Sequence, residues 1–225
     1  MTNMVGMVWS ILDRDINTRI CLDRGFVNTR CLAKHVIKEI TKENPSMQNK
    51  ISLDATISSI RRYEKKIDFK DSLDKARKAA VGVAISTKSN IAIVCLEKDR
   101  VVQKLLPEFF SVINYSRNEV LRVAQADESI KIAVDEKNLD KILNLVPKTS
   151  IISVTKGLAE INLKTHEISH DTPGVISTIT TELFLHNINI LEMVTLIPEV
   201  IIILKNNDLL PAYEAISKLT SPKTL

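Results

Sequence analysis

The sequence has few cysteines, glycines and aromatic residues, and it has no long apolar run. Its 225 residues include three cysteines, five glycines and 4% aromatic residues, and its longest strongly apolar run extends only from Val200 to Leu204. A membrane-spanning helix needs about 20 apolar residues, so the sequence predicts no membrane span. The first residues lack the basic segment and the apolar stretch of a secretory signal, and we therefore expect a cytoplasmic protein.

The scarcity of cysteine and glycine also excludes several kinds of site. Cys21, Cys31 and Cys95 have the spacing of neither a disulfide framework nor a zinc site, and we expect buried thiols in a reducing compartment. The glycines do not cluster into a phosphate-binding loop, and the Gly-x-Ser-x-Gly motif is absent. His166 and His170 are four residues apart, but they lie in a predicted loop rather than on a helix. We therefore predict no metal, no cofactor and no catalytic residues.

Charge divides the chain into two parts. Residues 1–80 hold 16 Lys and Arg against 10 Asp and Glu, a net charge of +6, whereas residues 81–225 hold 15 against 17, a net charge of −2. The same boundary separates two hydrophobic periods, because apolar residues recur every three or four positions before it and in short β-branched runs after it. Since 44% of all residues are hydrophobic, the chain can bury a core. The sequence predicts a basic helical domain over residues 1–82, with a connector helix at its end, followed by an α/β part.

The basic domain is predicted to contain short helices with recognisable ends. Apolar spacing predicts a first helix over about residues 4–14. Asn28 is predicted to cap the N-terminus of a later helix, which Asn44 and Pro45 end because proline has no N–H to donate. Ser52 is predicted to cap a further helix, whose apolar stripe consists of Leu53, Ile57, Ile60, Tyr63 and Ile67.

The outer face of the helix that follows Ser52 is small and basic. Between the apolar positions it carries Ser58, Ser59, Arg61, Arg62, Lys65 and Lys66. Three short helices with a basic third helix resemble a helix-turn-helix domain, whose last helix enters the major groove, so the resemblance implies that these six residues contact DNA. No β-hairpin wing is recognisable after Ile67. A solvated helix face, and a helical domain for dimerisation or partner docking, are the alternatives.

The α/β part is predicted to repeat one order of elements. Over residues 83–157 the order is strand, helix, strand, strand, helix, strand, and over residues 158–225 it is the same without an obvious last strand. Such a unit forms a ferredoxin-like antiparallel sheet with both helices on one face. We therefore predict an α+β fold, in which an all-α helix-turn-helix-like domain precedes two ferredoxin-like βαββαβ domains. The predicted strands are 90–96, 119–126, 129–135, 150–155, 159–164, 188–195 and 199–205, and the predicted helices are 100–113, 139–146, 174–186 and 209–219.

Three motifs of the second repeat carry a resemblance to a known family. Asp171-Thr172-Pro173-Gly174-Val175-Ile176 opens a helix, Asn187-Ile188-Asn189-Ile190 opens a strand, and Pro198-Glu199-Val200-Ile201 opens the next. With these motifs the repeat resembles an ACT domain, the small-molecule-sensing module of amino-acid metabolism, and most of all the tandem pair at the regulatory end of aspartate kinases. In the first repeat, the segment from Ser129 to Asp135 is similar to the same family, but the loop at residues 97–100 lacks the Pro-Gly. The whole arrangement is similar to an uncharacterised archaeal family of ACT-domain regulators.

The Thr-Pro-Gly segment is predicted to start a helix that can bind an anion. Thr172 stands where an N-cap belongs and Pro173 where the first helical residue belongs, because the fixed φ of proline suits the first turn. The free N–H groups of the next residues suit the carboxylate of an amino acid, since a helix start carries partial positive charge. An ordinary helix cap is the alternative. Together with the ACT resemblance, this predicts a ligand site formed by Asp171, Thr172, Pro173, Gly174, Val175, Ile176, Asn187 and Asn189.

Two functions follow from these interpretations. The preferred one is a transcriptional regulator that senses an amino acid and binds DNA. The alternative is a non-catalytic regulatory subunit that senses an amino acid and docks on a metabolic enzyme. The apolar strand from Val200 to Leu204 would invite aggregation at a free sheet edge, so we also predict a homodimer or larger homo-oligomer, joined through residues 159–205.

Overall fold

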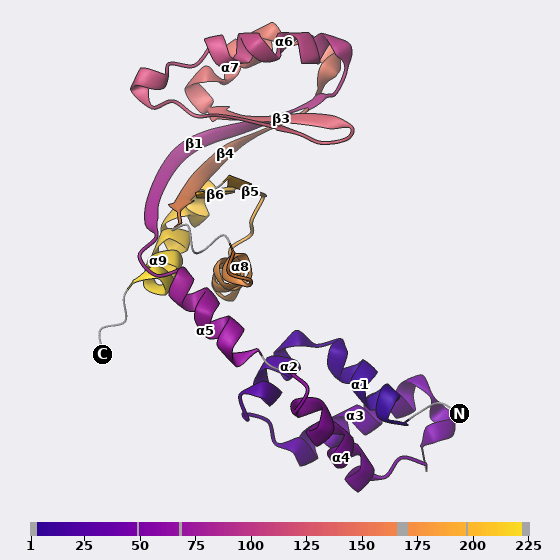
Figure 1. Cartoon of the computed structure of the whole chain (residues 1–225). Helices are drawn as coiled ribbons and strands as arrows, with labels where there is room; N and C mark the ends of the chain where they lie inside the picture. Colours follow the sequence, from indigo (N-terminus) through magenta and orange to yellow (C-terminus); the bar gives the residue numbers. More distant parts are fainter. Residues whose placement is uncertain (1–3, 49, 68, 166–170, 197, 222–225) are drawn as a thin grey trace. The chain divides into compact units, whose positions relative to one another are not determined.

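The chain divides into two compact units, which span residues 1–76 and 77–225. The computed structural model describes residues 4–48, 50–67, 69–165, 171–196 and 198–221. We call the first unit the helical unit and the second the sheet unit (Figure 1). The division falls within α5 (Lys70–Ala79), the predicted connector helix. Among the described residues, no helix combines the length and the apolar character needed to cross a membrane.

Two helices of the helical unit begin at the N-cap residues that the sequence predicts. The Asn28 side chain accepts hydrogen bonds from the backbone N–H groups of Arg30 and Cys31, both at 3.1 Å, and so caps the third helix. The Ser52 hydroxyl accepts from the N–H of Ala55 at 3.5 Å and caps the fourth. The helices of this unit before α5 are α1 (Met4–Asp13), α2 (Ile16–Asp23), α3 (Thr29–Glu43) and α4 (Leu53–Glu64).

The core of the helical unit joins α1, α2, α3 and α4. Trp9 packs edge-on against Tyr63, with their ring centroids 5.8 Å apart, and its indole N–H donates to the Ser59 carbonyl at 3.2 Å. The prediction of buried thiols was wrong, because Cys31 is exposed and Cys21 and Cys95 are only partly buried. The buried apolar residues of this core are Val8, Leu12, Leu22, Ala33, Val36, Ile40, Ile60 and Tyr63.

The sheet unit is built on one antiparallel sheet of six strands in the order β2-β3-β1-β4-β6-β5. The order of elements along the chain is the predicted alternation of strands and helices. The strands are β1 (Ala84–Glu97), β2 (Leu121–Gln125), β3 (Ser129–Asp135), β4 (Ile151–Lys164), β5 (Glu192–Leu196) and β6 (Glu199–Lys205). The helices are α6 (Arg100–Ser111), α7 (Glu136–Leu145), α8 (Val175–Leu185) and α9 (Leu209–Thr220).

Two long strands, β1 and β4, run through both halves of this sheet. In the first half, the end of β1 pairs with β3 from Ile91↔Asp135 to Glu97↔Ser129. In the second half, the start of β1 pairs with the end of β4, beginning with Ala84↔Lys164. The predicted strands 150–155 and 159–164 are thus one strand, and the strand that the second repeat lacked is supplied by the start of β1.

The two shared strands bend where the halves meet. Asn90 in β1 has a φ of 58° and Gly157 in β4 has a φ of 71°, and the β1–β4 register shifts between Ser89 and Ile91. An extra residue in one strand of an antiparallel pair bends and twists it. Figure 1 shows the result, because β1 and β4 curve between the end of the sheet near α6 and α7 and the end near α8 and α9.

Each face of the sheet has its own core. Beneath α6 and α7, alternate residues of β1 and β3 pack with Phe109 and Leu139. The opposite, concave face carries a second apolar cluster formed by Ile91, Ile93, Val120, Ala133, Leu158, Ile201 and Ile203. The curl of the sheet therefore brings residues of β3 and β6, which belong to different halves, into one buried group.

The segment from Val200 to Leu204 does not lie at a free edge of the sheet. These residues form most of β6, which lies between β4 and β5 and pairs with both. The outer strand of the second half is β5 instead. The premise for self-association through residues 159–205 therefore shifts to β5, where Met193 and Leu196 are exposed.

Candidate functional site

The basic face predicted on α4 is present on the surface of the helical unit. Arg61, Arg62, Lys65 and Lys66 are all exposed; the two arginines lie in the last turn of α4 and the two lysines in the turn that follows it. Within the described residues, none of the four forms an ion pair with an acid. Arg62 donates to the backbone carbonyl of Ser58 at 3.5 Å, and the Lys66 ammonium lies 4.8 Å from the centroid of the Trp9 ring. The cations are thus presented to solvent without neutralising carboxylates.

One residue predicted for this face is in the core. Ser59 is fully buried, as are Thr56, Ile60 and Tyr63 on the same side of α4. The reason is the three- and four-residue spacing of these positions, which places Ser59 against α1, where its carbonyl accepts from Trp9. Ser58 is exposed, as predicted. The proposed DNA contact at Ser59 is therefore excluded by its burial, and the other five residues remain together.

The Asp-Thr-Pro-Gly segment starts its helix later than predicted. Helix α8 begins at Val175, and its N-cap is Gly174, with a φ of 92°; no side chain of the described residues caps it. Thr172 is therefore not the N-cap and Pro173 is not the first helical residue, so both of those predictions were wrong. Only glycine adopts this left-handed conformation without strain, which is why the helix cannot start before it.

The remaining predicted ligand residues lie at the two ends of α8. Asp171, Pro173 and Gly174 are exposed, whereas the Val175 side chain is buried in the core. At the other end, Asn187 has a φ of 57° and its N–H donates to the Phe184 carbonyl at 2.9 Å, so it ends the helix, and Asn189 is exposed two residues later. The ligand site at these residues stays a prediction. His166 and His170 lie outside the described residues.

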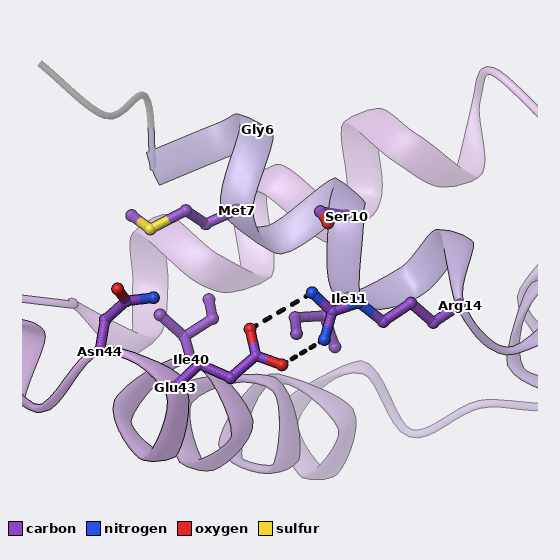
Figure 2. Close-up of a pocket in the computed structure, with 8 residues that line it drawn as sticks. All are labelled: Gly6, Met7, Ser10, Ile11, Arg14, Ile40, Glu43 and Asn44. Atoms are coloured by element: carbon purple, nitrogen blue, oxygen red, sulfur yellow. Dashed lines mark hydrogen bonds and ion pairs between the residues drawn. The ribbon is translucent and has the colours of Figure 1, made fainter.

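A cavity of about 350 Å³ lies between α1 and α3 in the helical unit (Figure 2). Gly6, Met7, Ser10 and Ile11 of α1 line one side, and Ile40, Glu43 and Asn44 line the other. Figure 2 shows that the Arg14 guanidinium and the Glu43 carboxylate form a two-point ion pair at its edge. Arg14 lowers the pKa of Glu43 by this pair, and the carboxylate is therefore already occupied. The cavity offers mostly apolar walls, with Ser10 and Asn44 as its uncharged polar residues, and no charged side chain without a partner among the residues that line it.

A second hollow, of about 340 Å³, lies on the concave face of the sheet unit. Its floor is formed by two cross-strand pairs, Ser86↔Asn162 and Lys88↔Glu160, because directly paired residues point to the same face. Arg122 of β2 reaches across and donates to Glu160 Oε1 at 3.0 Å. We call this the concave hollow.

The concave hollow contains buried polar atoms without hydrogen-bond partners. Glu160 is only 3% exposed, and its Oε2 has no partner among the described residues; the same holds for Arg122 Nε and Asn162 Oδ1. A buried polar atom without a partner typically costs about 1–3 kcal/mol. Three such atoms around one hollow are unusual, since most buried polar groups in native proteins are hydrogen-bonded.

Another carboxylate of the hollow is fully committed. Glu119 forms an ion pair with Lys137 at 2.9 Å and accepts from the Asn114 N–H and the Asn138 amide at 2.9 and 2.8 Å. These contacts lower the pKa of Glu119 to about 2, and the Lys137 ammonium has the largest effect. Glu119 is therefore an anion with its acceptors used. In the described part of the chain, no group of three or more His, Cys, Asp and Glu residues is arranged to hold a metal ion.

The comparisons with known proteins find similar structures only. No protein-family model and no curated protein matches the chain. A chain of the aspartokinase alpha and beta subunits is 15% identical, with a TM-score of 0.51 over 64% of this chain and 97% of that one. The sheet unit has an ACT-type fold. At this identity the likeness establishes the fold and not the activity.

Two further structures of the same enzyme resemble the ACT-type sheet unit more loosely. The aspartate kinase of Clostridium acetobutylicum is 17% identical, with a TM-score of 0.49 over 62% of this chain. This chain spans 35% of the length of that enzyme. The ligand-free regulatory subunit of aspartate kinase from Thermus thermophilus is 12% identical, with a TM-score of 0.48, over 62% of this chain and 98% of that one. The helix-turn-helix resemblance of the helical unit stays a prediction.

The concave hollow was not predicted from the sequence, although the ACT-type fold was. Glu160 and Asn162 alternate with apolar residues along β4, a pattern that predicts a solvent-facing side of a strand. Only the curl of the sheet brings Arg122 over them. Within the sequence, only Lys88 hints at this site. It lies in the polar start of β1, directly opposite Glu160 in the register of β1 and β4.

Proposed function

We propose that this chain is a non-catalytic cytoplasmic regulator, in which the ACT-type sheet unit binds a free amino acid and the helical unit binds DNA. The ACT-type fold supports the first part, because the resemblance implies a small-molecule sensor of amino-acid metabolism. The observation that carries the second part is the exposed row of Arg61, Arg62 and Lys65 on α4, which no described acid neutralises.

Such a face suits the phosphates of DNA. Neutralisation of phosphates by Lys and Arg releases counterions, so the affinity falls steeply as the salt concentration rises. An amino acid that binds one arrangement of the protein more tightly than another shifts the population toward it, and this difference in affinity is what a ligand-dependent change in DNA binding requires.

The test measures how the affinity of the full chain for duplex DNA depends on the salt concentration. Binding is measured by fluorescence anisotropy. The parent is compared with the double variant Arg62→Gln/Lys65→Gln, which leaves Lys66 on the Trp9 ring. We expect weaker binding at all salt concentrations, and a salt slope reduced by about one for each phosphate contact that is lost.

A charge-matched control is available on α3. Lys38 and Lys42 are exposed and one turn apart, so Lys38→Gln/Lys42→Gln removes the same charge from a different helix. If α4 is the binding face, this control retains most of the parent affinity. Equal losses in both variants, or no measurable binding by the parent at low salt, would contradict the DNA-binding proposal.

A regulatory subunit that docks on an enzyme is the second candidate. The observation that favours it is the match to a chain of the aspartokinase alpha and beta subunits. The match covers 97% of that chain, so nearly the whole of that chain has the fold of the sheet unit. A contact of this kind, made through apolar residues, need not weaken as salt rises. Salt-insensitive association with a purified aspartate kinase, without DNA binding, would favour this candidate.

A further inference from the structure

The Arg122–Glu160 ion pair of the concave hollow has an inner and an outer partner. The Glu160 side chain is 3% exposed and the Arg122 side chain is 36% exposed, so Arg122 lies on the solvent side of the pair. One carboxylate oxygen, Oε1, accepts from Arg122, while Oε2 has no partner. Arg122 can therefore turn toward solvent, but Glu160 cannot leave the floor of the hollow.

One cation of the hollow has no acidic partner, although the charges that line the hollow balance in number. Glu119 is committed to Lys137, Asn138 and a backbone N–H. Lys88 donates to the backbone carbonyl of Asn118 and forms no ion pair within the described residues. Two cations, Lys88 and Arg122, therefore share one available carboxylate. A ligand with a carboxylate is electrostatically favoured here, since opposite charges attract more strongly in a partly desolvated site than in water.

A negative charge alone does not complete the hollow. A carboxylate that drew Arg122 away from Glu160 would leave a buried anion without a partner, which is strongly unfavourable. A ligand that also carries an ammonium group replaces the lost pair, because Glu160 Oε2 and Asn162 Oδ1 are unpartnered acceptors close together on adjacent positions of one strand face. One internal ion pair is then exchanged for two pairs with the ligand.

We propose that the concave hollow is the binding site of a free α-amino acid, whose carboxylate is held by Lys88 and Arg122 and whose ammonium is held by Glu160 and Asn162. This inference deepens the proposed function and rests on it, since it names the site at which the amino acid binds. The volume of about 340 Å³ lies at the lower end of the range for small-molecule sites, as a single amino acid requires. The site differs from the predicted one at the start of α8.

The charge exchange predicts a particular selectivity. The amide of the same amino acid lacks the carboxylate that replaces Glu160 as the partner of Arg122. The N-acetyl derivative lacks the ammonium that replaces Arg122 as the partner of Glu160. Neither derivative can bind both Glu160, the inner partner, and Arg122, the outer partner. We therefore expect only the free amino acid to bind.

The experiment is calorimetric titration of the full chain with each of the twenty amino acids, and then with the amide and N-acetyl derivatives of any that bind. Two hollow variants, Lys88→Met and Glu160→Gln, are compared with Lys98→Met, whose ammonium also donates to a loop carbonyl, that of Ala126 at 3.2 Å. We expect Lys88→Met and Glu160→Gln to weaken binding about tenfold or more, as loss of a charge-assisted hydrogen bond does, and Lys98→Met to bind as the parent does.

The outcomes separate this inference from the proposed function. An amino acid that binds the hollow variants as tightly as the parent, but is lost in Asp171→Ala, would overturn the hollow as the site and leave amino-acid sensing intact. Binding of the amide or N-acetyl form with parent-like affinity would also overturn it. If no amino acid binds, the sensing proposal itself falls. Lys88→Met keeps the test valid if Glu160→Gln lowers stability, because Lys88 is only half-buried.

Discussion

The two halves of the sheet unit start their first helices in different ways. In the first half, Asp99 caps α6, with its carboxylate accepting from the Val102 N–H at 2.7 Å and from the Ser150 hydroxyl at 2.8 Å. These two donors, the Val102 N–H first, lower the pKa of Asp99. In the second half, Gly174 precedes α8 and no side chain caps it. An external anion at the start of α6 would have to displace Asp99, whereas at the start of α8 the described residues place no capping carboxylate.

The same two helices differ in how they bury their aromatic residues. Phe109 of α6 is fully buried in the core of the first half, whereas Phe184 of α8 is 75% exposed. The first half thus has a capped helix start and a buried phenylalanine, although Val101 and Phe110 of the same helix are 51% and 50% exposed. The second half leaves an uncapped helix start and an exposed phenylalanine.

The largest expected effect concerns the two phenylalanines. Phe109→Ala should lower the free energy of unfolding by about 3–5 kcal/mol, because it removes a large buried side chain and leaves a cavity. Phe184→Ala should change it by no more than about 0.5 kcal/mol, as is usual for surface substitutions. Urea unfolding of both variants measures the difference. Similar losses of unfolding free energy in both variants would show that Phe184 contributes as much to a core as Phe109 does.

Phe184 also tests the predicted homodimer. Phe184 and Leu185 are both exposed, at 75% and 68%, within the segment 159–205 through which we expect the chain to self-associate. If it does, Phe184→Ala should shift the sedimentation coefficient toward that of a monomer at micromolar concentration. A monomeric parent protein would contradict the dimer prediction.

The next effect concerns the bend that joins the halves. At both Gly157 and Gly6 an added Cβ would meet no atom within 4 Å, but only Gly157 has a positive φ, of 71°. Gly157→Ala should therefore destabilise by about 1–2 kcal/mol through backbone strain alone. Gly6→Ala in α1 is the matched control and should stabilise, by up to about 1 kcal/mol, because alanine favours a helix. Thermal unfolding of both proteins decides the sign of each change.

The cap of α6 gives a smaller effect. Asp99→Ala removes the acceptor for Val102 and should lower the melting temperature by about 2–4 °C, the shift expected when one helix cap is lost from a chain of this size. Asp99→Asn keeps an acceptor and should recover part of the loss. Asp171→Ala, next to the uncapped helix, should leave the melting temperature unchanged. A loss at Asp171 equal to that at Asp99 would remove the contrast between the two helix starts.

The last effect is confined to acid. The pKa of Glu119 is lowered from 4.5 to about 2 in the folded chain, so the unfolded chain binds the proton first as the pH falls. The stability from this carboxylate is therefore fully present above pH 4.5 and is lost as the pH falls toward about 2. Glu119→Gln should flatten the dependence of stability on pH in this range, measured by urea unfolding. An unchanged pH dependence would contradict the role of Lys137, Asn114 and Asn138 as its partners.

Local features of the fold could be predicted from the sequence. Asn28 and Ser52 cap their helices as predicted, since a cap depends only on the next three residues. The predicted strands 129–135 and 199–205 match β3 and β6, because β-branched residues recur along both and those of β6 are buried on both faces. The start of β1 was missed, because it is polar and owes its structure to pairing with β4.

The candidate sites were less predictable, for the same physical reason. Ser59 was placed on the outer face of α4, because its polarity suggested exposure, whereas the packing of Trp9 against α4 determines its burial. The helix start at Gly174 depends on the positive φ of this glycine. A glycine in the sequence allows that angle but does not require it. The concave hollow requires the bend at Asn90 and Gly157, which brings Arg122 to Glu160 from another strand. No pattern within a short window contains that information.

The shared strands also determine how the sheet unit can fold. Ala84 pairs with Lys164, 80 residues later, so the sheet of the second half cannot close before the whole first half has been synthesised. Until then the start of β1 has no partner strand. Contacts of such long range slow folding, because the entropy of closing the intervening chain is lost before the contacts form. Once formed, they leave no strand at which the two halves can separate, and the sheet unit should unfold in one cooperative transition rather than half by half.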